Sequence, residues 1–573
     1  MGRTTVRVET AAEAYLELLA DRGIEYFFAN PGTDFAPLID AFARRAARGR
    51  HLPRPVLVPH ENVAVAMAYG YYQVSGRPQA VMVHVNVGTA NALNGIINAA
   101  RDQIPILLCA GRTPLTEQGA HGCRNLYIHW TQECYDQAGM VREFVKWDYE
   151  LRSAAQLETV VDRALELAMA QPRGPVYLTL PREVLAEPLQ GFGMASPSRH
   201  NIAGGLQPDA ESISAAAGML AAARNPLIIA TSSGRNPESV GNLMDLAESF
   251  AIPVVTFNPR YLSFPTDHPL HLGFTPDPFL DQADLVLVLD SNVPWYPDQK
   301  KPGEDCKVIH LAVDPFYRDL PIRGFPCDLP LQGDSALILP LLKKELGLHR
   351  TRAAAAISER RARLEEMHRK QRAGWREALQ RAVERTPLDP LWVSHCIDRV
   401  KDDDTLIFNE YDLDPTQVSF NKAGTFFGNP SAGGLGWGLG AALGAKLASP
   451  GKTVISTLGD GSYLFGNPTP CHFVSRSLGA PTLTVIFNNS CYNAVRQATM
   501  GMYPEGWGAR GDLPPLTGIE PSPRLEMLIG ASDGYGERVD RPDQVVPALE
   551  RGLRAVREEG RPAVLNMICR LPG

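Results

Sequence analysis

The stretch that decides the fold runs from residue 453 to residue 492 and reads TVISTLGDGSYLFGNPTPCHFVSRSLGAPTLTVIFNNSCY. It holds two apolar, β-branched runs, at 453–458 and 482–487, which predict buried parallel strands. A segment of helical length, about 469–478, separates them. The stretch is therefore one strand–helix–strand unit, and open α/β sheets bind their ligands where such strands end.

Polar residues follow each of the two predicted strands. Gly459, Asp460 and Gly461 come after the first strand, and Asn489 comes after the second. An Asp-Gly pair is first of all a turn signal, so the triplet alone does not define a site. A carboxylate and a carboxamide at one sheet edge, however, offer the hard oxygen ligands that Mg²⁺ takes, usually together with a phosphate. From Gly459 to Asn489 the stretch resembles the motif, opening with GDG and closing with NN, of thiamine diphosphate (ThDP) enzymes.

This resemblance implies roles for individual residues of the stretch. The side chains of Asp460 and Asn489 and the backbone carbonyl of Cys491 would hold Mg²⁺. The diphosphate end of the cofactor would be bound by the residues Gly459, Asp460, Gly461, Ser462, Asn489 and Tyr492.

Glu61 is the main candidate in the N-terminal part, where helices and strands alternate and predict a doubly wound parallel sheet. It lies between a predicted strand at 55–58 and a predicted helix at 63–74. A carboxylate at a helix start is favoured by the helix dipole, and this is the structural alternative for Glu61. The surrounding VPHENVAVAMAYGYYQVSG (58–76) resembles the segment that carries the essential glutamate of ThDP enzymes. The resemblance implies that Glu61 hydrogen-bonds N1′ of the aminopyrimidine, so that the 4′-amino nitrogen can take the C2 proton.

The glycine-rich segment SAGGLGWGLG (431–440) opens a small-residue helix. Glycines there would permit close helix–sheet packing, which is the structural alternative. The resemblance implies instead that Gly433 gives its backbone carbonyl to the 4′-amino group. It also implies that Leu435 lies beneath the cofactor rings and forces their bent, V-shaped arrangement.

Candidate substrate residues come from two further resemblances. The NPGT run (30–33) and His84 resemble the serine and histidine that line the pocket of benzoylformate decarboxylases, and His84 could shuttle a proton near neutral pH. The segment WTQE (130–133) resembles the glutamine-bearing segment of acetolactate synthases. Thr33, His84 and Gln132 are therefore candidate catalytic residues, with a packed strand histidine and an exposed loop amide as the alternatives for His84 and Gln132. The decarboxylases have a second pocket histidine, and the segment 292–297, where we expect it, contains none.

The resemblance covers nearly the whole chain and implies an α/β fold of three doubly wound parallel-sheet domains. We expect a pyrimidine-binding domain with Glu61 at 1–188 and a linker at 189–208. A central α/β domain at 209–346, an interdomain helical segment at 347–386 and a diphosphate-binding domain at 387–573 would follow. The length of 573 residues, with 44% apolar and 21% charged residues, suits a globular protein of this size.

The group that the chain resembles contains acetolactate synthase, pyruvate oxidase and benzoylformate decarboxylase. It implies a ThDP- and Mg²⁺-dependent enzyme that decarboxylates a 2-oxo acid to a cofactor-bound enamine, which is then protonated or ligated to a second carbonyl substrate. We do not expect FAD, because the segment LGFTPDP (272–278) is short and lacks the Gly and His residues of the flavin-binding members. One alternative is a ThDP-dependent lyase or hydrolase that cleaves a C–C bond without releasing CO₂. The other is a nicotinamide or flavin oxidoreductase, which predicts a GxGxxG turn where the first strand instead ends in NPGT.

Composition excludes several other classes of protein. A net charge of −7 with 56 basic residues gives no sign of nucleic-acid binding. No run of about 18 apolar residues predicts a membrane span. The nine cysteines form no CxxC pair and the N-terminus is charged, so we expect reduced thiols, no signal peptide and a cytoplasmic protein. The family resemblance further implies a homodimer or homotetramer with active sites between subunits.

Overall fold

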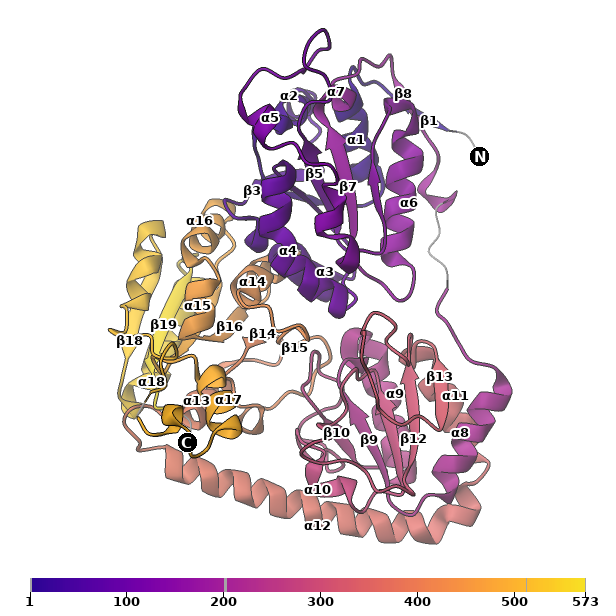
Figure 1. Ribbon diagram of the computed structural model, residues 1–573. Coiled ribbons are helices and arrows are strands. Elements are labelled where there is room, and N and C mark those ends of the chain that lie inside the picture. The colour runs from indigo at the N-terminus through magenta and orange to yellow at the C-terminus, as the bar shows by residue number, and fades with distance from the viewer. Residues whose placement is uncertain (1–2, 200–203, 512, 572–573) are drawn as a thin grey trace.

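The computed structural model describes residues 3–199, 204–511 and 513–571 and contains three parallel-sheet α/β domains. Figure 1 shows the N-terminal domain in indigo and purple, the central domain in magenta and the C-terminal domain in orange and yellow. The predicted fold class is confirmed. The domain boundaries given above remain predictions.

The N-terminal domain has a six-stranded parallel sheet in the order β3-β2-β4-β5-β7-β6. Its strands are β2 (Tyr26–Asn30), β3 (Arg54–Leu57), β4 (Ala80–Val83), β5 (Leu107–Arg112), β6 (Asp148–Glu150) and β7 (Val176–Pro181). Its helices are α1 (Ala11–Asp21), α2 (Ala36–Ala47), α3 (Glu61–Ser75), α4 (Val85–Arg101), α5 (Ile128–Thr131), α6 (Leu157–Met169) and α7 (Arg182–Leu185). A separate antiparallel pair, β1 (Thr4–Val6) with β8 (Phe192–Met194), ties the N-terminus to the segment expected as a linker. Residues 200–203 of that segment lie outside the described residues.

The helix after β4 begins directly at the end of the strand. It starts at Val85, with His84 as its N-cap residue. The backbone N–H of Gly88 donates to the carbonyl of His84, so the NVGT segment (86–89) forms the first turn of the helix. His84 and Val85 are therefore held at the carboxyl edge of the sheet, and Val85 has a positive φ of 34°.

The central domain has a five-stranded parallel sheet in the order β10-β9-β11-β12-β13. Its strands are β9 (Pro226–Ala230), β10 (Val254–Thr256), β11 (Leu285–Leu289), β12 (Lys307–Ala312) and β13 (Leu329–Gln332). Its helices are α8 (Ala210–Ala222), α9 (Pro237–Phe250), α10 (Asp277–Leu280) and α11 (Ser335–Gly347). The short strand β13 contains Pro330, which is tolerated because β13 lies at the edge of the sheet.

The C-terminal domain has a six-stranded parallel sheet in the order β15-β14-β16-β17-β19-β18. Its strands are β14 (Leu406–Glu410), β15 (Phe426–Gly428), β16 (Val454–Gly459), β17 (Leu483–Asn488), β18 (Tyr535–Val539) and β19 (Ala563–Ile568). Its helices are α13 (Pro390–Val400), α14 (Trp437–Ala448), α15 (Asp460–Phe465), α16 (Pro468–Leu478), α17 (Asn493–Met502) and α18 (Val545–Arg557). The long helix α12 (Arg350–Ala382) leads from the central domain to this one, along the lower edge of the molecule in Figure 1.

Helices α3 and α14 form the contact between the N-terminal and C-terminal domains. A Cβ atom on Gly70 would lie 2.0 Å from the carbonyl oxygen of Ala441, and one on Gly444 would lie 1.9 Å from that of Met67. The small residues of α14 therefore permit close packing of two helices, beyond the helix–sheet packing expected from the sequence. This contact brings the start of α3, with Glu61, to the turn that precedes α14.

Candidate active site

Glu61 is the first residue of α3 and is 8% exposed. Asn30, at the end of β2, donates a 2.9 Å hydrogen bond to its Oε1, and Asn91 of α4 donates a 2.5 Å bond to its Oε2. Three segments of the N-terminal domain thus converge on one buried carboxyl group. Two neutral amides hold it in place, and no cation of the described residues pairs with it.

The turn at 433–436 lies next to Glu61 because α4 holds it there. Asn94 donates hydrogen bonds to the side-chain oxygen of Asn62 (3.3 Å) and to the backbone carbonyl of Leu435 (3.0 Å). Asn98 donates to the carbonyl of Gly434 at 2.8 Å. Among the described residues no donor reaches the carbonyl of Gly433, so this carbonyl is free to accept a hydrogen bond from a ligand.

The side chain of Glu410 also holds the turn at 433–436. Its carboxylate accepts hydrogen bonds from the backbone N–H groups of Gly436 (2.7 Å) and Gly438 (2.5 Å) at the start of α14. Gly436 has a φ of +82°, a conformation that side chains rarely adopt. Burial raises the pKa of Glu410 to about 7, although the N–H groups of this helix start favour its charged form. Glu410 therefore fixes the turn and lies outside the space that faces Glu61.

The predicted metal residues come together at the edge of the C-terminal sheet. Asp460 is 2% exposed; its Oδ1 accepts the N–H of Gly461 at 2.9 Å, and its Oδ2 is buried without a partner. Burial raises the pKa of Asp460 to about 6, while the nearby N–H groups of Ser490 and Cys491 lower it. The side-chain oxygen of Asn489 accepts the N–H of Cys491 at 3.0 Å. An orphaned buried carboxylate oxygen beside amide and carbonyl oxygens fits a Mg²⁺ ion.

No three His, Cys, Asp or Glu side chains cluster as a metal site in the described part of the chain. A cation at Asp460 would therefore be completed by amide and backbone oxygens and by a ligand that brings oxygens of its own. This donor set is the one expected for Mg²⁺ bound together with a diphosphate.

The remaining residues predicted for the cofactor lie around Asp460. Ser462 is buried within α15, and the ring of Tyr492 lies against Gly461, where a Cβ atom would come within 2.5 Å of it. A carboxylate that was not predicted, Asp412, lies against Gly459 in the same way. Burial raises the pKa of Asp412 to about 7, and the charge of Asp460 makes a smaller contribution in the same direction.

His84 and Gln132 meet at the opposite end of the site. The Nε2 atoms of the two side chains lie 3.3 Å apart. Nδ1 of His84 lies 2.5 Å from Oδ1 of Asp34, a residue that is 3% exposed. The hydrogen bond to Asp34 raises the pKa of His84 above its usual value, and burial of the ring opposes it. Asp34 was not predicted, although its position directly after the NPGT run could have drawn attention to it.

Thr33 lies beside a second histidine that the sequence did not reveal. Oγ1 of Thr33 is 3.4 Å from Nε2 of His129, on α5. The ring Nδ1 accepts N–H groups from Asn125 (3.2 Å) and Leu126 (3.3 Å), so the Nε2 position carries the proton. Burial lowers the pKa of His129 and keeps the ring neutral. A second histidine thus lies beside Thr33, on the N-terminal domain and not in the segment 292–297 where one was expected.

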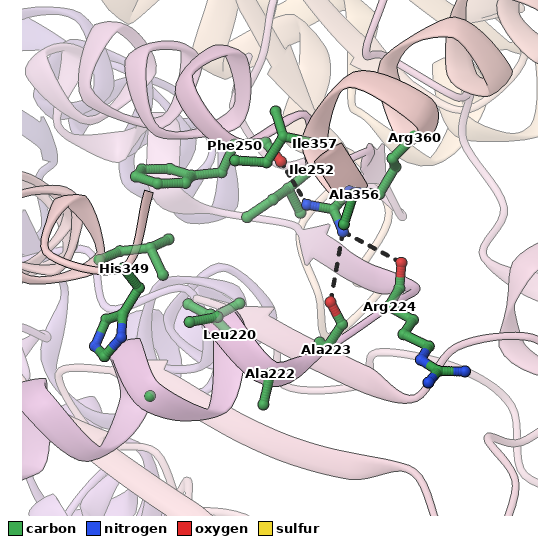
Figure 2. Close-up of a pocket in the computed structure, with 13 residues that line it drawn as sticks. Leu220, Ala222, Ala223, Arg224, Phe250, Ile252, His349, Ala356, Ile357 and Arg360 are labelled. Atoms are coloured by element: carbon green, nitrogen blue, oxygen red, sulfur yellow. Dashed lines mark hydrogen bonds between the residues drawn. The ribbon is translucent and has the colours of Figure 1, made fainter. Parts of the chain in front are cut away.

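A cavity of about 640 Å³ lies elsewhere, between α8, α9 and α12 of the central region (Figure 2). Figure 2 shows the guanidinium of Arg360 beside this cavity, where it donates to the carbonyls of Ala223 and Arg224. It also donates to those of Ala251 and Phe250. Because the backbone carbonyls satisfy this charge, Arg360 is not free to bind a ligand in the cavity.

Three domain families of thiamine pyrophosphate enzymes match successive parts of the chain. They are the N-terminal TPP binding domain at residues 9–140, the central domain at 213–342 and the C-terminal TPP binding domain at 413–567. The chain belongs to the thiamine pyrophosphate enzyme family. The predicted family is thus confirmed. Glu61 falls within the first matched region, and Asp460 and Asn489 fall within the last.

Relatives in this family include decarboxylases and synthases. Benzoylformate decarboxylase of Pseudomonas aeruginosa is 28% identical over 85% of this chain and 88% of its own length. Acetolactate synthase of Mycobacterium bovis is 25% identical over 98% of this chain and 88% of its own. The structure of a thiamine diphosphate-dependent 4-hydroxybenzoylformate decarboxylase from Rhodococcus jostii superposes with a TM-score of 0.76, at 22% identity and over 98% and 99% of the two chains. The last likeness concerns the fold alone.

No helix in the described ranges is both long and apolar enough to cross a membrane. The nine cysteines form no disulfide in the described residues.

Proposed function

We propose that this family member is a ThDP- and Mg²⁺-dependent enzyme that decarboxylates a 2-oxo acid. The observation that carries the proposal is a set of three polar groups that the two joined domains contribute. They are the Glu61 carboxyl, the free carbonyl of Gly433 and the orphaned Oδ2 of Asp460. The benzoylformate decarboxylase and acetolactate synthase relatives support the choice of a 2-oxo acid as substrate.

The cofactor would lie between the two domains, and residues of both domains would bind it. When bound, thiamine diphosphate supplies the electron sink that lets a 2-oxo acid lose CO₂. Glu61 holds N1′ of the pyrimidine through a hydrogen bond, and the carbonyl of Gly433 accepts one from the 4′-amino group. Leu435 would lie beneath the rings. At the other end Mg²⁺ is held by Asp460, Asn489 and the carbonyl of Cys491, and the diphosphate site is lined by Gly459, Gly461, Ser462 and Tyr492.

The substrate end supplies protons and hydrogen bonds. His84, whose pKa Asp34 raises, is placed to transfer a proton through Nε2, which in the neutral ring accepts the amide N–H of Gln132. Thr33 and neutral His129 form a second polar pair for the substrate carboxylate. A protonated donor in the site favours release of an aldehyde. The acetolactate synthase relative supports a second outcome, ligation to another carbonyl compound, in which Gln132 would face the acceptor.

The proposal is tested with purified protein, ThDP and Mg²⁺ on a panel of 2-oxo acids that includes pyruvate, benzoylformate and 4-hydroxybenzoylformate. We expect CO₂ release in step with substrate loss, and product analysis by NMR separates an aldehyde from a ligation product. Cleavage of a cyclic diketone or an acyloin without release of CO₂ would contradict decarboxylation and favour a lyase or hydrolase.

We propose no flavin, so the holoenzyme is expected to lack the absorbance near about 450 nm that this cofactor would bring.

We further propose a cytoplasmic homodimer or homotetramer with active sites between subunits. Within one chain Asn94 and Leu435 already join the two halves, and the same contacts would form between chains if the domains were exchanged. Mixing subunits that carry Glu61→Gln with subunits that carry Asp460→Ala distinguishes the two arrangements. Sites between subunits would regain activity in the mixed dimer, whereas sites within one chain would stay inactive.

A further inference from the structure

Asp412 lies at the same sheet edge as the metal residue Asp460. It follows β14, Asp460 follows β16, and these two strands are parallel neighbours with Glu410 opposite Leu458. Tyr411 and Asp412 both have left-handed backbones, with φ values of 67° and 70°. The chain therefore turns sharply after β14 and directs Asp412 back toward the end of β16.

The Asp412 carboxylate is packed against the residue that precedes Asp460. A Cβ atom on Gly459 would lie 2.5 Å from Oδ2 of Asp412, so only glycine leaves room for this carboxylate. Within the described residues Asp412 accepts no hydrogen bond and forms no ion pair. The adjacent Asp460 likewise has no cationic partner there, and its Oδ2 is buried and unpaired. Two carboxyl groups thus lie at one sheet edge, close enough for their charges to interact, with no ion-pair partner among the described residues.

Such an arrangement is unfavourable until a cation enters. Like charges repel strongly where water is partly excluded, and buried charges in proteins are paired or bind metals. Mg²⁺ accepts one or two carboxylates alongside phosphate and water oxygens, so a second carboxylate is compatible with its coordination. The same carboxylate would repel a diphosphate that arrived without a cation.

We propose that Asp412 is a second acidic group of the divalent-cation site, so that the chain takes up the cation before the diphosphate. This inference rests on the proposed metal site at Asp460. It assigns Asp412 two opposite effects, attraction of the cation and repulsion of the cation-free diphosphate. A carboxylate that only shaped the turn would have neither effect.

Asp412→Asn tests these effects because Asn also tolerates a left-handed backbone while removing the charge. Asp403→Asn, in the exposed loop before β14, is the matched control. Mn²⁺ binding to the ThDP-free protein is followed by the EPR signal of free Mn²⁺. We expect Asp412→Asn to weaken Mn²⁺ binding by at least about tenfold, and Asp403→Asn to leave it unchanged. ThDP binding in the presence of EDTA, followed by fluorescence quenching, should become tighter in Asp412→Asn.

The outcomes separate this inference from the proposed metal site. If Asp460→Asn abolishes Mn²⁺ binding while Asp412→Asn binds Mn²⁺ and cation-free ThDP like the wild type, Asp412 has only a structural role and the inference is wrong. If Asp460→Asn also binds Mn²⁺ like the wild type, the metal site itself is misplaced. Circular dichroism and thermal unfolding of each variant verify that the comparison is between folded proteins.

Discussion

The two ends of the candidate site differ in whether their charged side chains have partners. At the metal end Asp460 and Asp412 have no cationic partner among the described residues, and burial raises the pKa of both carboxyls. At the substrate end His84 is paired with Asp34. Neutral His129 is fixed there by backbone N–H groups. The proposed metal end therefore lacks a balancing charge among the described residues, whereas the proposed substrate end is organised by the chain itself.

The largest effect is expected at the proposed metal end. Asp460→Ala removes the orphaned carboxylate oxygen that would bind Mg²⁺, so the protein should lose Mg²⁺-dependent ThDP binding altogether. Equilibrium dialysis with labelled ThDP and Mg²⁺ measures this directly, with Asp403→Ala as an exposed control. Binding of ThDP at the wild-type level would show that Asp460 is not part of the metal site.

The metal end was also the easier end to predict from the sequence. Its residues lie in one strand–helix–strand unit, where spacing along the chain fixes position in space. The six-residue helix α15 escaped prediction because it is too short for a hydrophobic period to appear. Asp412 escaped because it reaches Asp460 from a different strand.

The substrate end was harder to predict because it is assembled from three separate segments. Thr33, His84 and Gln132 were identified through family resemblance, yet their partners Asp34 and His129 were not. No spacing rule places residue 129 beside residue 33, since that contact depends on how the loop after β5 folds back over the sheet. Contacts between segments that are distant in the sequence can be identified only from the three-dimensional structure.

A smaller effect is expected when the substrate end loses its proton donor. His84→Gln keeps a polar side chain of similar length but removes the titratable ring, so kcat/KM should fall by about 10²- to 10³-fold. ThDP and Mg²⁺ affinities should remain at wild-type values, because the pair His84–Asp34 does not contact the metal end. Steady-state kinetics and dialysis on the same preparation test both statements, and a loss of cofactor binding would contradict the division into two ends.

The smallest effect is expected from Asp34→Asn, which keeps His84 in place but removes its charged partner. The pKa of His84 should fall, so the protonated donor is lost at lower pH and the alkaline limb of the kcat/KM profile moves to lower pH. At neutral pH the rate should drop by about tenfold. ¹⁵N NMR of the His84 ring in the cofactor-free protein measures the pKa without relying on activity. An unchanged His84 pKa would show that Asp34 has no influence on its protonation.

The same pair has a consequence for stability. Because the folded pKa of His84 is raised, the pair stabilises the fold at pH values below the unfolded histidine pKa of about 6.5. This contribution is lost as the pH rises through the folded pKa. Asp34→Asn should therefore lower the unfolding temperature more at pH 5.5 than at pH 8.5, values about one to two units on either side of the unfolded pKa.

The central claim is that Glu61 acts on a cofactor held between the two domains. Glu61→Gln retains the size and the hydrogen bonds of the side chain but removes its acid, so folding and Mg²⁺-ThDP binding should survive. The direct measurement is C2–H/D exchange of bound ThDP, followed by NMR after an acid quench. We expect exchange in Glu61→Gln to be slower than in the wild type by about 10²- to 10⁴-fold. Exchange at the wild-type rate would show that Glu61 is only the first residue of a helix and that the proposed mechanism is wrong.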